Sequence, residues 1–440
     1  KDENLTGIRS PLVAIMIHPP VFGAEPISCN ENEVLEQAGV KAVVKISSGF
    51  GIVAERYWQL IKAREVFKGT WKNPKKLFDT NEYKQECLSL IENYEGEDNG
   101  SEGEDYKKQE IEIEEIYTVP YLAHAPLEPL NCTVDISKDS ATVWYSTQSP
   151  GNVKALVSEI SGLSESDIVV HSASVGGGFG RRSACDSLVK AAEISNQLKQ
   201  PIKLVYSRED DMKAGYYRPF VVTKMKASIS ETGKEIYFKQ ATATQSLMAD
   251  TIPQAVVGAT PSWVSNGISR AIGRFAVRFI DGRTVAEGAV PPYNFKGAQI
   301  KWQKTSTPVP IQWWRSVGHT QNGFFVESFT DEIAHRLGQD PMDFRESRLK
   351  NEKRQLAVLK KVKEMSGWGK DSRSLGVACH FSFKSYAAAV IETVDSPTGV
   401  KVKNVWAALD CGRVINPDGV HAQIMGSVIF GLTAALYGKI

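Results

Sequence analysis

The sequence predicts a mixed α/β or α+β protein made of several units, and three observations support this prediction. The chain has 440 residues, 42% of them hydrophobic and 23% charged, which suits a globular protein of about two to four domains. Short apolar runs with strand character alternate with stretches of helical periodicity. Residues 168–206 follow the order strand, glycine-rich turn, helix, strand, which is the order of a βαβ unit.

The N-terminal part of the chain predicts a small α/β unit followed by a linker. Apolar runs at 12–17, 43–44 and 51–54 precede a helical pattern at 55–67. Residues 92–115 then hold 11 acidic side chains, two lysines and three glycines. Because like charges repel and few of these side chains are apolar, we expect a solvated linker or loop there.

The remaining chain alternates strands and helices. Ser149 and Pro150 offer an N-cap and a first helical position ahead of an apolar face formed by residues 153, 156, 157 and 160. We predict strands at 111–119, 142–146, 168–171, 202–206, 390–394 and 400–409. We predict further helices near 183–198, at 322–337 and from about residue 420.

Composition excludes several classes of protein. The six cysteines lie far apart without a CxxC pair, so we expect neither a disulfide scaffold nor a metal cluster held by this chain alone. The longest apolar run, 425–437, is shorter than a bilayer span, and the chain starts with neither Met nor an apolar signal core. We therefore expect a soluble globular protein or a fragment of one.

The charge is unevenly distributed. Outside the acidic segment the chain holds 50 basic and 40 acidic residues. This positive excess suits nucleic acid or an anionic small-molecule cofactor, and charge alone does not decide between them. The basic residues do not form runs interleaved with aromatic ones, so we expect no nucleic-acid partner.

The glycine-rich turn in residues 174–182, SVGGGFGRR, is the most distinctive motif. Successive glycines allow close backbone approach to a ligand, and free N–H groups at a helix start favour an anion. The motif is not a P-loop, and Arg181 stands where the dinucleotide fingerprint needs its third glycine. On its own it fits a tight strand–helix connection with solvated arginines equally well.

Other polar residues have ordinary explanations when each is viewed alone. Gln148 could donate its amide to an oxo or phosphate group, and Gln423 is a polar residue inside an apolar helix. Arg315 follows two tryptophans. It could lie beside an aromatic wall, or it could be a surface residue next to a tryptophan pair in the core. His124 and Glu128 have an i, i+4 spacing, but the prolines around them exclude a helix, so we expect a structural turn.

Taken in order, eight segments resemble the large, molybdopterin-binding subunit of the xanthine oxidase superfamily. The most similar branch contains the isoquinoline 1-oxidoreductase β-subunit and membrane-associated aldehyde dehydrogenase large subunits, in which the glycine loop ends in Arg-Arg. The resemblance extends from about Thr6 to the last residue. The segments that carry it are 121–129, 146–150, 175–182, 206–212, 314–318, 327–332, 410–413 and 423–426.

The resemblance implies a fold and an activity. The fold would comprise an α/β hammerhead domain at 1–91, the acidic linker at 92–116, a first molybdopterin-binding domain at 117–350 and a second, incomplete one at 351–440. The activity would be that of a molybdenum hydroxylase, which oxidises an aldehyde or N-heterocycle with water-derived oxygen. The implied cofactor is molybdopterin with molybdenum, in its cytosine dinucleotide form. The implied partners are a small 2Fe-2S subunit, a cytochrome electron acceptor and a small-molecule substrate.

The resemblance also implies site residues. Gln148 matches the glutamine that hydrogen-bonds the apical oxo group, and Arg315 matches an arginine next to the active site. Arg181 and Arg182 are placed near an anionic cofactor or substrate, and Ser183 stands where xanthine-type enzymes carry a substrate-orienting Glu, which disfavours a purine. No side chain is expected to ligate the metal. The expected cofactor-binding residues are Gly176, Gly177, Gly178, Phe179, Gly180, Arg181, Arg182, Gln423 and Gly426.

The sequence departs from the family pattern in three places. The Gly-x-Gly-Glu segment with the catalytic Glu is absent, a glutamate–glycine–glutamine–glycine cofactor loop is absent, and the stretch between residues 7 and 12 is short. We therefore expect that this polypeptide does not turn over. One alternative is a catalytically silent scaffold without cofactor. Another is a nicotinamide-dependent dehydrogenase, which rests on the βαβ unit alone. The branch is often exported and membrane-associated, and a cytoplasmic location stays open.

Overall fold

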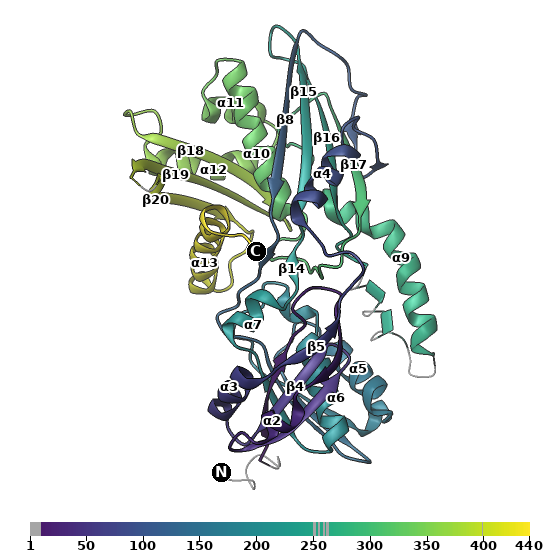
Figure 1. The fold of residues 1–440 in the computed structure, drawn as a ribbon. Helices are drawn as coiled ribbons and strands as arrows, with labels where there is room; N and C mark the ends of the chain where they lie inside the picture. The colour runs from purple at the N-terminus through teal and green to yellow at the C-terminus, as the bar shows by residue number, and fades with distance from the viewer. Residues whose placement is uncertain (1–9, 250–251, 254–255, 258–259, 261–263, 398) are drawn as a thin grey trace.

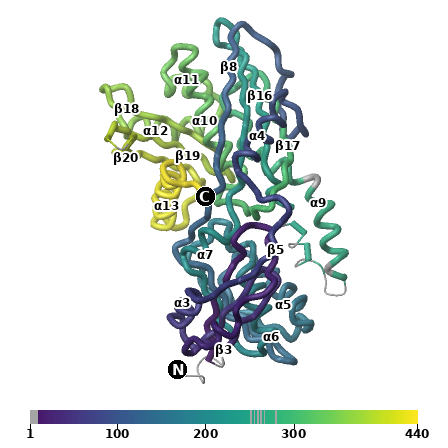
Figure 2. The backbone as a smooth tube through the Cα atoms, viewed as in Figure 1, coloured from purple at the N-terminus to yellow at the C-terminus, as the bar shows by residue number. Residues whose placement is uncertain are grey.

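Figures 1 and 2 show a computed structural model that describes residues 10–249, 252–253, 256–257, 260, 264–397 and 399–440. Two main lobes lie one above the other, with the N-terminal strands in the lower lobe. A third, smaller lobe with the C-terminal strands lies beside the upper one. The chain is therefore mixed α/β, as the sequence predicts.

The lower lobe is built on one seven-stranded sheet. In spatial order its strands are β12 (Ile168–Ser172), β11 (Ala141–Tyr145), β10 (Asn131–Ile136), β13 (Ile202–Val205), β1 (Leu12–Ile17), β4 (Gly49–Ala54) and β3 (Val40–Ile46). One face packs on α5 (Val153–Ser161) and α6 (Asp186–Leu198), and the other packs on α3 (Tyr57–Val66). Alternate residues of β1 face the two cores, as a strand buried on both sides requires.

The strands of the expected unit at 1–91 are divided between two sheets, because β1, β3 and β4 join the seven-stranded sheet while β2 (Glu25–Cys29) and β5 (Gly69–Lys72) pair only with each other. β1 pairs in parallel with β13, so strands from residues 12–54 and from 131–205 share one set of ladder hydrogen bonds. β12, α6 and β13 do follow one another as predicted, but β11 and β10 lie between the two strands. Strand membership across such distances depends on tertiary packing, which a local pattern does not encode.

The upper lobe is built on a six-stranded sheet. Its order is β6 (Glu97–Asp98), β17 (Gly297–Thr305), β16 (Ile236–Gln245), β15 (Val221–Ile229) and β8 (Ile111–Val119), with β7 (Glu102–Gly103) also pairing with β17. Helix α10 (His319–Arg336) packs on one face and α4 (Thr80–Leu90) on the other, while α9 (Asn266–Ala286) packs against β17.

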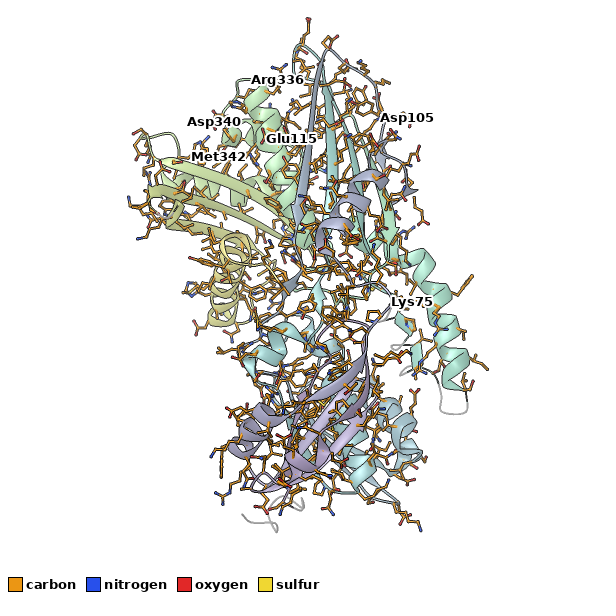
Figure 3. The ribbon with its side chains drawn as sticks, in the orientation of Figure 1. Lys75, Asp105, Glu115, Arg336, Asp340 and Met342 are labelled. Atoms are coloured by element: carbon orange, nitrogen blue, oxygen red, sulfur yellow. The ribbon has the colours of Figure 1, made fainter. Side chains whose placement is uncertain are left out.

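Parts of the acidic segment, at 97–98, 102–103 and 111–115, belong to strands of this sheet, while its acidic side chains are exposed to solvent. β8 pairs with β15 along its whole length, and β6 and β7 pair with β17. Lysines of β15 neutralise the strand, because Lys226 Nζ lies 3.0 Å from Glu112 and Lys224 Nζ lies 2.9 Å from Glu114. The other acidic side chains, such as Asp105 and Glu115 in Figure 3, are exposed at the surface of this lobe.

The third lobe confirms the predicted C-terminal strands and helix. It contains β18 (Ser374–Ser382), β19 (Ser385–Ser396) and β20 (Gly399–Asp410), with α11 (Pro341–Arg348), α12 (Lys353–Ser366) and α13 (Pro417–Leu436). The apolar run at 425–437 is largely part of α13, whose 20 residues are by length and composition enough to cross a membrane. None of its residues is buried in the structure.

The remaining described elements are short, and most of them lie where the sequence carries no clear periodicity. They are β2 (Glu25–Cys29), α2 (Glu31–Leu35), β5 (Gly69–Lys72), β9 (Leu122–Ala123), the 3-10 helices η1 (Pro150–Asn152), η2 (Glu165–Asp167) and η3 (Arg181–Ser183), α7 (Arg208–Lys213) and β14 (Tyr217–Arg218).

Candidate functional site

The glycine-rich turn joins β12 to η3 and α6 in a conformation that needs its glycines. Gly177 and Gly180 have φ of 94° and 101°, and Phe179 between them has φ of 54°. A Cβ at Gly180 would collide with the carbonyl oxygen of Trp313. The loop is therefore strained at its centre, as backbone held close to a ligand often is.

The two arginines that follow are buried, so the alternative in which they are solvated was wrong, and their role near an anionic cofactor or substrate stays a prediction. Arg181 is 1% exposed and forms two hydrogen bonds with Asp186, at 2.6 and 3.0 Å. Arg182 is fully buried and donates to Gly177 O and Ser146 Oγ at 2.8 Å each. Carboxylates of the chain itself thus neutralise both guanidinium groups, while Arg181 Nε has no hydrogen-bond partner among the described residues.

Glu128 is the main partner of Arg182. Arg182 Nη2 donates to both the backbone oxygen and Oε2 of Glu128, at 2.8 Å each, and Oε2 also accepts the N–H of Gly176 at 3.0 Å. Burial raises the pKa of Glu128, but hydrogen bonds from Asn131 and Gly176 and the charge of Arg182 outweigh it, so its pKa lies below the usual value. The carboxylate is ionised and holds the start of the loop.

His124 has a structural role. Its two ring nitrogens lie 3.2 Å from the Tyr216 carbonyl oxygen and 3.0 Å from the Trp313 carbonyl oxygen. Burial lowers its pKa to about 4, so the ring is neutral at neutral pH. The structural turn expected around His124 and Glu128 is confirmed, and no group of three or more metal-ligating side chains occurs in the part of the chain that the structure describes.

Gln148 lies over the glycine loop. Its Oε1 accepts the N–H of Gly180 at 3.0 Å, and its own backbone N–H donates to Arg182 O at 3.2 Å. A Cβ at Gly178 would run into the Gln148 amide. Because Oε1 is the acceptor, the Nε2 group is a donor, and within the described residues it has no acceptor. The exposed amide can therefore donate to a bound oxygen.

Arg315 joins the loop to helix α13. Its N–H donates to Phe179 O at 2.8 Å, and its Nη2 donates to Ser427 Oγ at 2.7 Å and approaches Gln423 Oε1 at 3.5 Å. The guanidinium lies 5.2 Å from the ring centres of both Phe179 and Phe430. Burial lowers the pKa of Arg315, but a half-buried guanidinium stays charged at neutral pH.

The structure thus brings together four of the predicted residues, namely Gln148, Phe179, Arg315 and Gln423, around the glycine loop. Gly426 lies on the same helix, but within the described structure nothing lies within 4 Å of a Cβ added to it. Sequence reasoning missed Ser427 and Phe430. Both follow Gln423 at helical spacing, i+4 and i+7, which was a usable signal.

The resulting site combines the exposed amide of Gln148 with the cation of Arg315 beside the glycine loop. Such a set favours an anionic or oxygen-rich ligand.

Family models and curated relatives match this chain. A family model described as the molybdopterin cofactor-binding domain matches residues 89–260, and a second model with the same description matches residues 333–440. The chain is 28% identical over 452 aligned positions to isoquinoline 1-oxidoreductase subunit beta of Brevundimonas diminuta, covering 98% of this chain and 55% of the relative. It is 26% identical over 434 positions to a membrane-bound aldehyde dehydrogenase of Gluconacetobacter polyoxogenes, covering 88% and 52%.

The fold has solved counterparts. Quinoline 2-oxidoreductase from Pseudomonas putida 86 superposes with a TM-score of 0.61 at 14% identity, over 90% of this chain and 59% of the other. The chain spans about half the length of the curated relatives named above. With two cofactor-binding domain matches and this fold, the chain belongs to the molybdopterin-binding family of the xanthine oxidase superfamily.

Proposed function

We propose that this chain provides the cofactor-binding body of a molybdenum hydroxylase that oxidises an aldehyde or an N-heterocyclic compound with oxygen derived from water. The observation that carries the proposal is the contact of Gln148 with the glycine loop, beside the cation of Arg315. These groups converge from elements far apart in the sequence.

The residues present fit a molybdopterin group. The donors are the Nε2 amide of Gln148, the strained backbone of the loop and the guanidinium of Arg315, and an anionic pterin with oxo and phosphate oxygens needs such donors. Gln423 lies next to Arg315, where its amide can contact the same ligand. A bound molybdenum–pterin group supplies oxidation of an electron-poor carbon.

The described residues bind and orient rather than transfer protons. Gln148 is fixed by Gly180, so its amide is directed before a ligand arrives. Arg315 is fixed by Ser427 and by two aromatic rings. Within the described chain no carboxylate contacts either side chain. We therefore assign no general base to these residues.

The names of two relatives support the substrate class, since one is an isoquinoline oxidoreductase and the other an aldehyde dehydrogenase. Ser183 in place of a carboxylate disfavours a purine. We propose the cytosine dinucleotide form of the cofactor, a small 2Fe-2S subunit as the electron acceptor and a cytochrome beyond it. The domain division into a hammerhead and two cofactor-binding domains is also part of the proposal.

Elemental analysis tests the proposal against the catalytically silent scaffold. The full-length protein that carries this chain would be expressed in a host that makes molybdopterin, and its molybdenum would be measured against protein. We expect stoichiometric molybdenum. Protein that is folded but free of molybdenum would favour the scaffold and contradict the proposal.

Gly178→Ala should reduce molybdenum retention. The new Cβ meets the Gln148 amide, so Gln148 has to leave Gly180 or the loop has to shift. We expect most of the bound molybdenum to be lost, at a stability cost of only about 1 kcal/mol, which is typical of one displaced hydrogen bond.

Gly151→Ala is the matched control for this substitution. Gly151 lies in η1 close to Gln148, and within the described structure nothing lies within 4 Å of an added Cβ. We expect this variant to keep its molybdenum. Equal molybdenum content in both variants would argue against the role of the Gln148–loop contact.

A further inference from the structure

Helix α9 carries large apolar side chains on the side that faces solvent. Ile268, Ile272 and Phe275 follow one another at spacings of four and three residues, which places them on one face of the helix. Their side chains are 57%, 52% and 61% exposed. Because a surface helix normally turns polar residues outward, this apolar stripe indicates a surface that another phase or molecule covers.

The opposite face of α9 is buried against the protein. Ser269, Val277 and Thr284 are at most 5% exposed, and the helix packs against β17. Near the start of the helix, Arg270 forms two hydrogen bonds with Glu159 of α5. Figure 1 shows α9 at the outer edge of the molecule, next to β17 and directed toward the lower lobe. The body of the protein therefore holds the helix from behind, and the apolar stripe faces away from it.

The exposed charges of α9 are positive. The helix contains four arginines and one acidic residue, Asp281. Asp281 is 2% exposed, and its carboxylate lies 3.4 Å from Lys304 Nζ. Arg274 and Arg283 are exposed, and neither pairs with a carboxylate among the described residues. The outward side of α9 is therefore apolar along its centre and cationic at its flanks.

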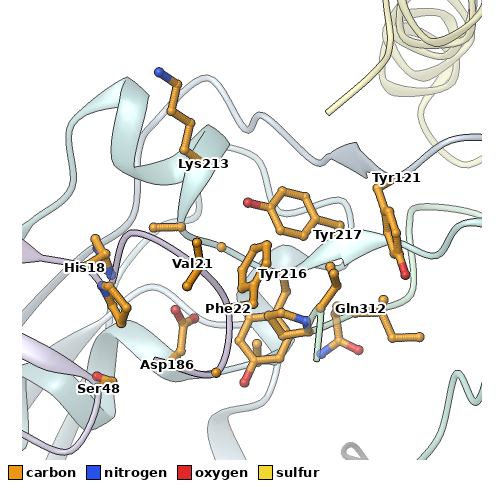
Figure 4. Close-up of a pocket in the computed structure, with 18 of the residues that line it drawn as sticks. His18, Val21, Phe22, Ser48, Tyr121, Asp186, Lys213, Tyr216, Tyr217 and Gln312 are labelled. Carbon is orange, nitrogen blue, oxygen red and sulfur yellow. The ribbon is translucent and has the colours of Figure 1, made fainter. Parts of the chain in front are cut away.

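This surface is separate from the sites described so far. The cavity in Figure 4, of about 850 Å³, lies between the lower and upper lobes, and none of its described lining residues belongs to α9. The contacts of Gln148 and Arg315 do not involve α9 either. The apolar stripe is thus not part of the glycine-loop site.

The shape and charge of α9 match a lipid surface better than a protein partner. A protein would have to offer an acidic groove shaped to fit a protruding ridge. A bilayer interface adapts to such a ridge and takes apolar side chains into its acyl boundary. Anionic headgroups then neutralise flanking arginines that have no partner in the protein.

We propose that α9 binds an anionic lipid surface, with Ile268, Ile272 and Phe275 at the acyl boundary and Arg274 and Arg283 at the headgroups. This inference goes beyond the proposed function and needs no molybdenum. Lipid binding and molybdenum content are therefore measured separately, and each can fail alone.

Vesicle sedimentation of the full-length protein tests the charge of the surface. One set of vesicles contains phosphatidylcholine alone, and in the other set phosphatidylglycerol replaces part of it. We expect binding to increase with the phosphatidylglycerol fraction and to fall as added salt screens the arginines. Equal binding to the two sets, or binding to neither, would overturn the proposal.

Isoleucine variants locate the binding. Ile272→Gln keeps the length of the side chain but makes it polar, so the protein should bind anionic vesicles about tenfold more weakly. The matched control Ile116→Gln changes a 50% exposed isoleucine of β8, at the opposite edge of the sheet from β17, and should bind as the natural protein does.

A third isoleucine variant examines the other exposed apolar helix. Ile429 is 63% exposed on α13, which is by length and composition enough to cross a membrane. Ile429→Gln should leave vesicle binding unchanged. An unchanged affinity in Ile272→Gln, or an equal loss in either other variant, would refute the assignment to α9.

Fluorescence quenching tests whether the stripe enters the bilayer. Phe275→Trp places an additional indole in the stripe, and phosphatidylcholine brominated on its acyl chains should quench it beyond the level of the natural protein. Phe383→Trp is the matched control, because Phe383 is a 64% exposed ring in the turn between β18 and β19. Equal additional quenching in the two variants would contradict insertion of α9.

Sedimentation equilibrium without lipid tests a second copy of the chain as the alternative occupant. An oligomer that dissociates in Ile272→Gln, together with no binding of the natural protein to anionic vesicles, would assign the stripe to self-association and overturn the proposal. Urea unfolding shows whether each variant is folded. If Ile272→Gln is not, Arg274→Gln and Arg283→Gln keep the test decisive, since each should weaken anionic-vesicle binding about fivefold. Molybdenum content should be unchanged in all the α9 variants.

Discussion

Arg182→Met should lower the free energy of unfolding by about 3 kcal/mol and release the glycine loop. The guanidinium is fully buried and donates to Gly177, Ser146 and both the backbone and the side chain of Glu128. Met fills similar space but leaves these acceptors unpaired. The cost is below that of a fully buried ion pair, because the Glu128 side chain is 38% exposed and can be hydrated.

If Arg182 positions the glycine loop, its substitution should reduce molybdenum binding as well as stability. If Arg182 acts through the loop, Arg182→Met should lose molybdenum under conditions where it is still folded, and Arg182→Lys should recover only part of it, since one ammonium cannot reproduce the fork of bonds. Arg354→Met is the control, because Arg354 forms a paired but half-exposed ion pair with Asp410. Arg354→Met should lower the free energy of unfolding by no more than about 1 kcal/mol. Full molybdenum in folded Arg182→Met would contradict the role.

The pH dependence of the free energy of unfolding follows from the pKa of Glu128. Its pKa in the folded protein lies below the unfolded value of about 4.3, so its contribution to stability is complete above that value. The contribution is lost as pH falls through the folded pKa. The stability difference between the natural protein and Glu128→Gln should therefore be constant near neutral pH and shrink in acid, in urea unfolding followed at several pH values. A difference that persists unchanged in acid would contradict the ionised pair.

The sequence predicts the parts of the site that depend on local chemistry. Gln148, the glycine loop and Arg315 stand in short segments, and the structure brings them together with Gln423. Arg182 was misplaced because its partner Glu128 is 54 residues away. Exposure of a long cationic side chain depends on such a partner, and a local motif does not contain it.

The fold, too, could be predicted only where it depends on residues that are close in the sequence. The strands at 12–17 and 111–119 match β1 and β8, because alternation and short apolar runs are local signals. The strands that pair with β1 and β8 are distant from them in the sequence. The acidic residues of β8 suggested a solvated segment because the lysines that pair with them stand more than a hundred residues later, on β15. The charge pattern therefore indicated only a solvated segment, whereas the alternation at 111–119 predicted the strand that the structure contains.

Glu327→Leu should be the most destabilising single substitution considered for the upper lobe, at about 3–5 kcal/mol. Glu327 is 5% exposed, and its carboxylate accepts from Arg345 at 3.0 Å, Tyr293 at 2.5 Å and the N–H of Cys379 at 2.7 Å. It thereby joins α10 to α11 and to β18. The segment 327–332, which carries part of the family resemblance, thus has a structural role.

The double variant Glu327→Leu/Arg345→Met separates the contribution of the Glu327–Arg345 ion pair to stability from that of side-chain packing. Removing only the carboxylate leaves Arg345, which is fully buried, with Asp331 as its remaining charged partner, and leaves the Tyr293 hydroxyl without its carboxylate acceptor. Removing both charges ends the desolvation penalty of the guanidinium, so the double variant should be more stable than the sum of the two single losses predicts.

The surface substitution Lys361→Ala is the control. Lys361 forms an ion pair in which both side chains are more than half exposed, so its loss should change the free energy of unfolding by less than about 1 kcal/mol. Additive losses in urea unfolding would show that Glu327 and Arg345 are not coupled, and that the cost comes from the other hydrogen bonds of Glu327.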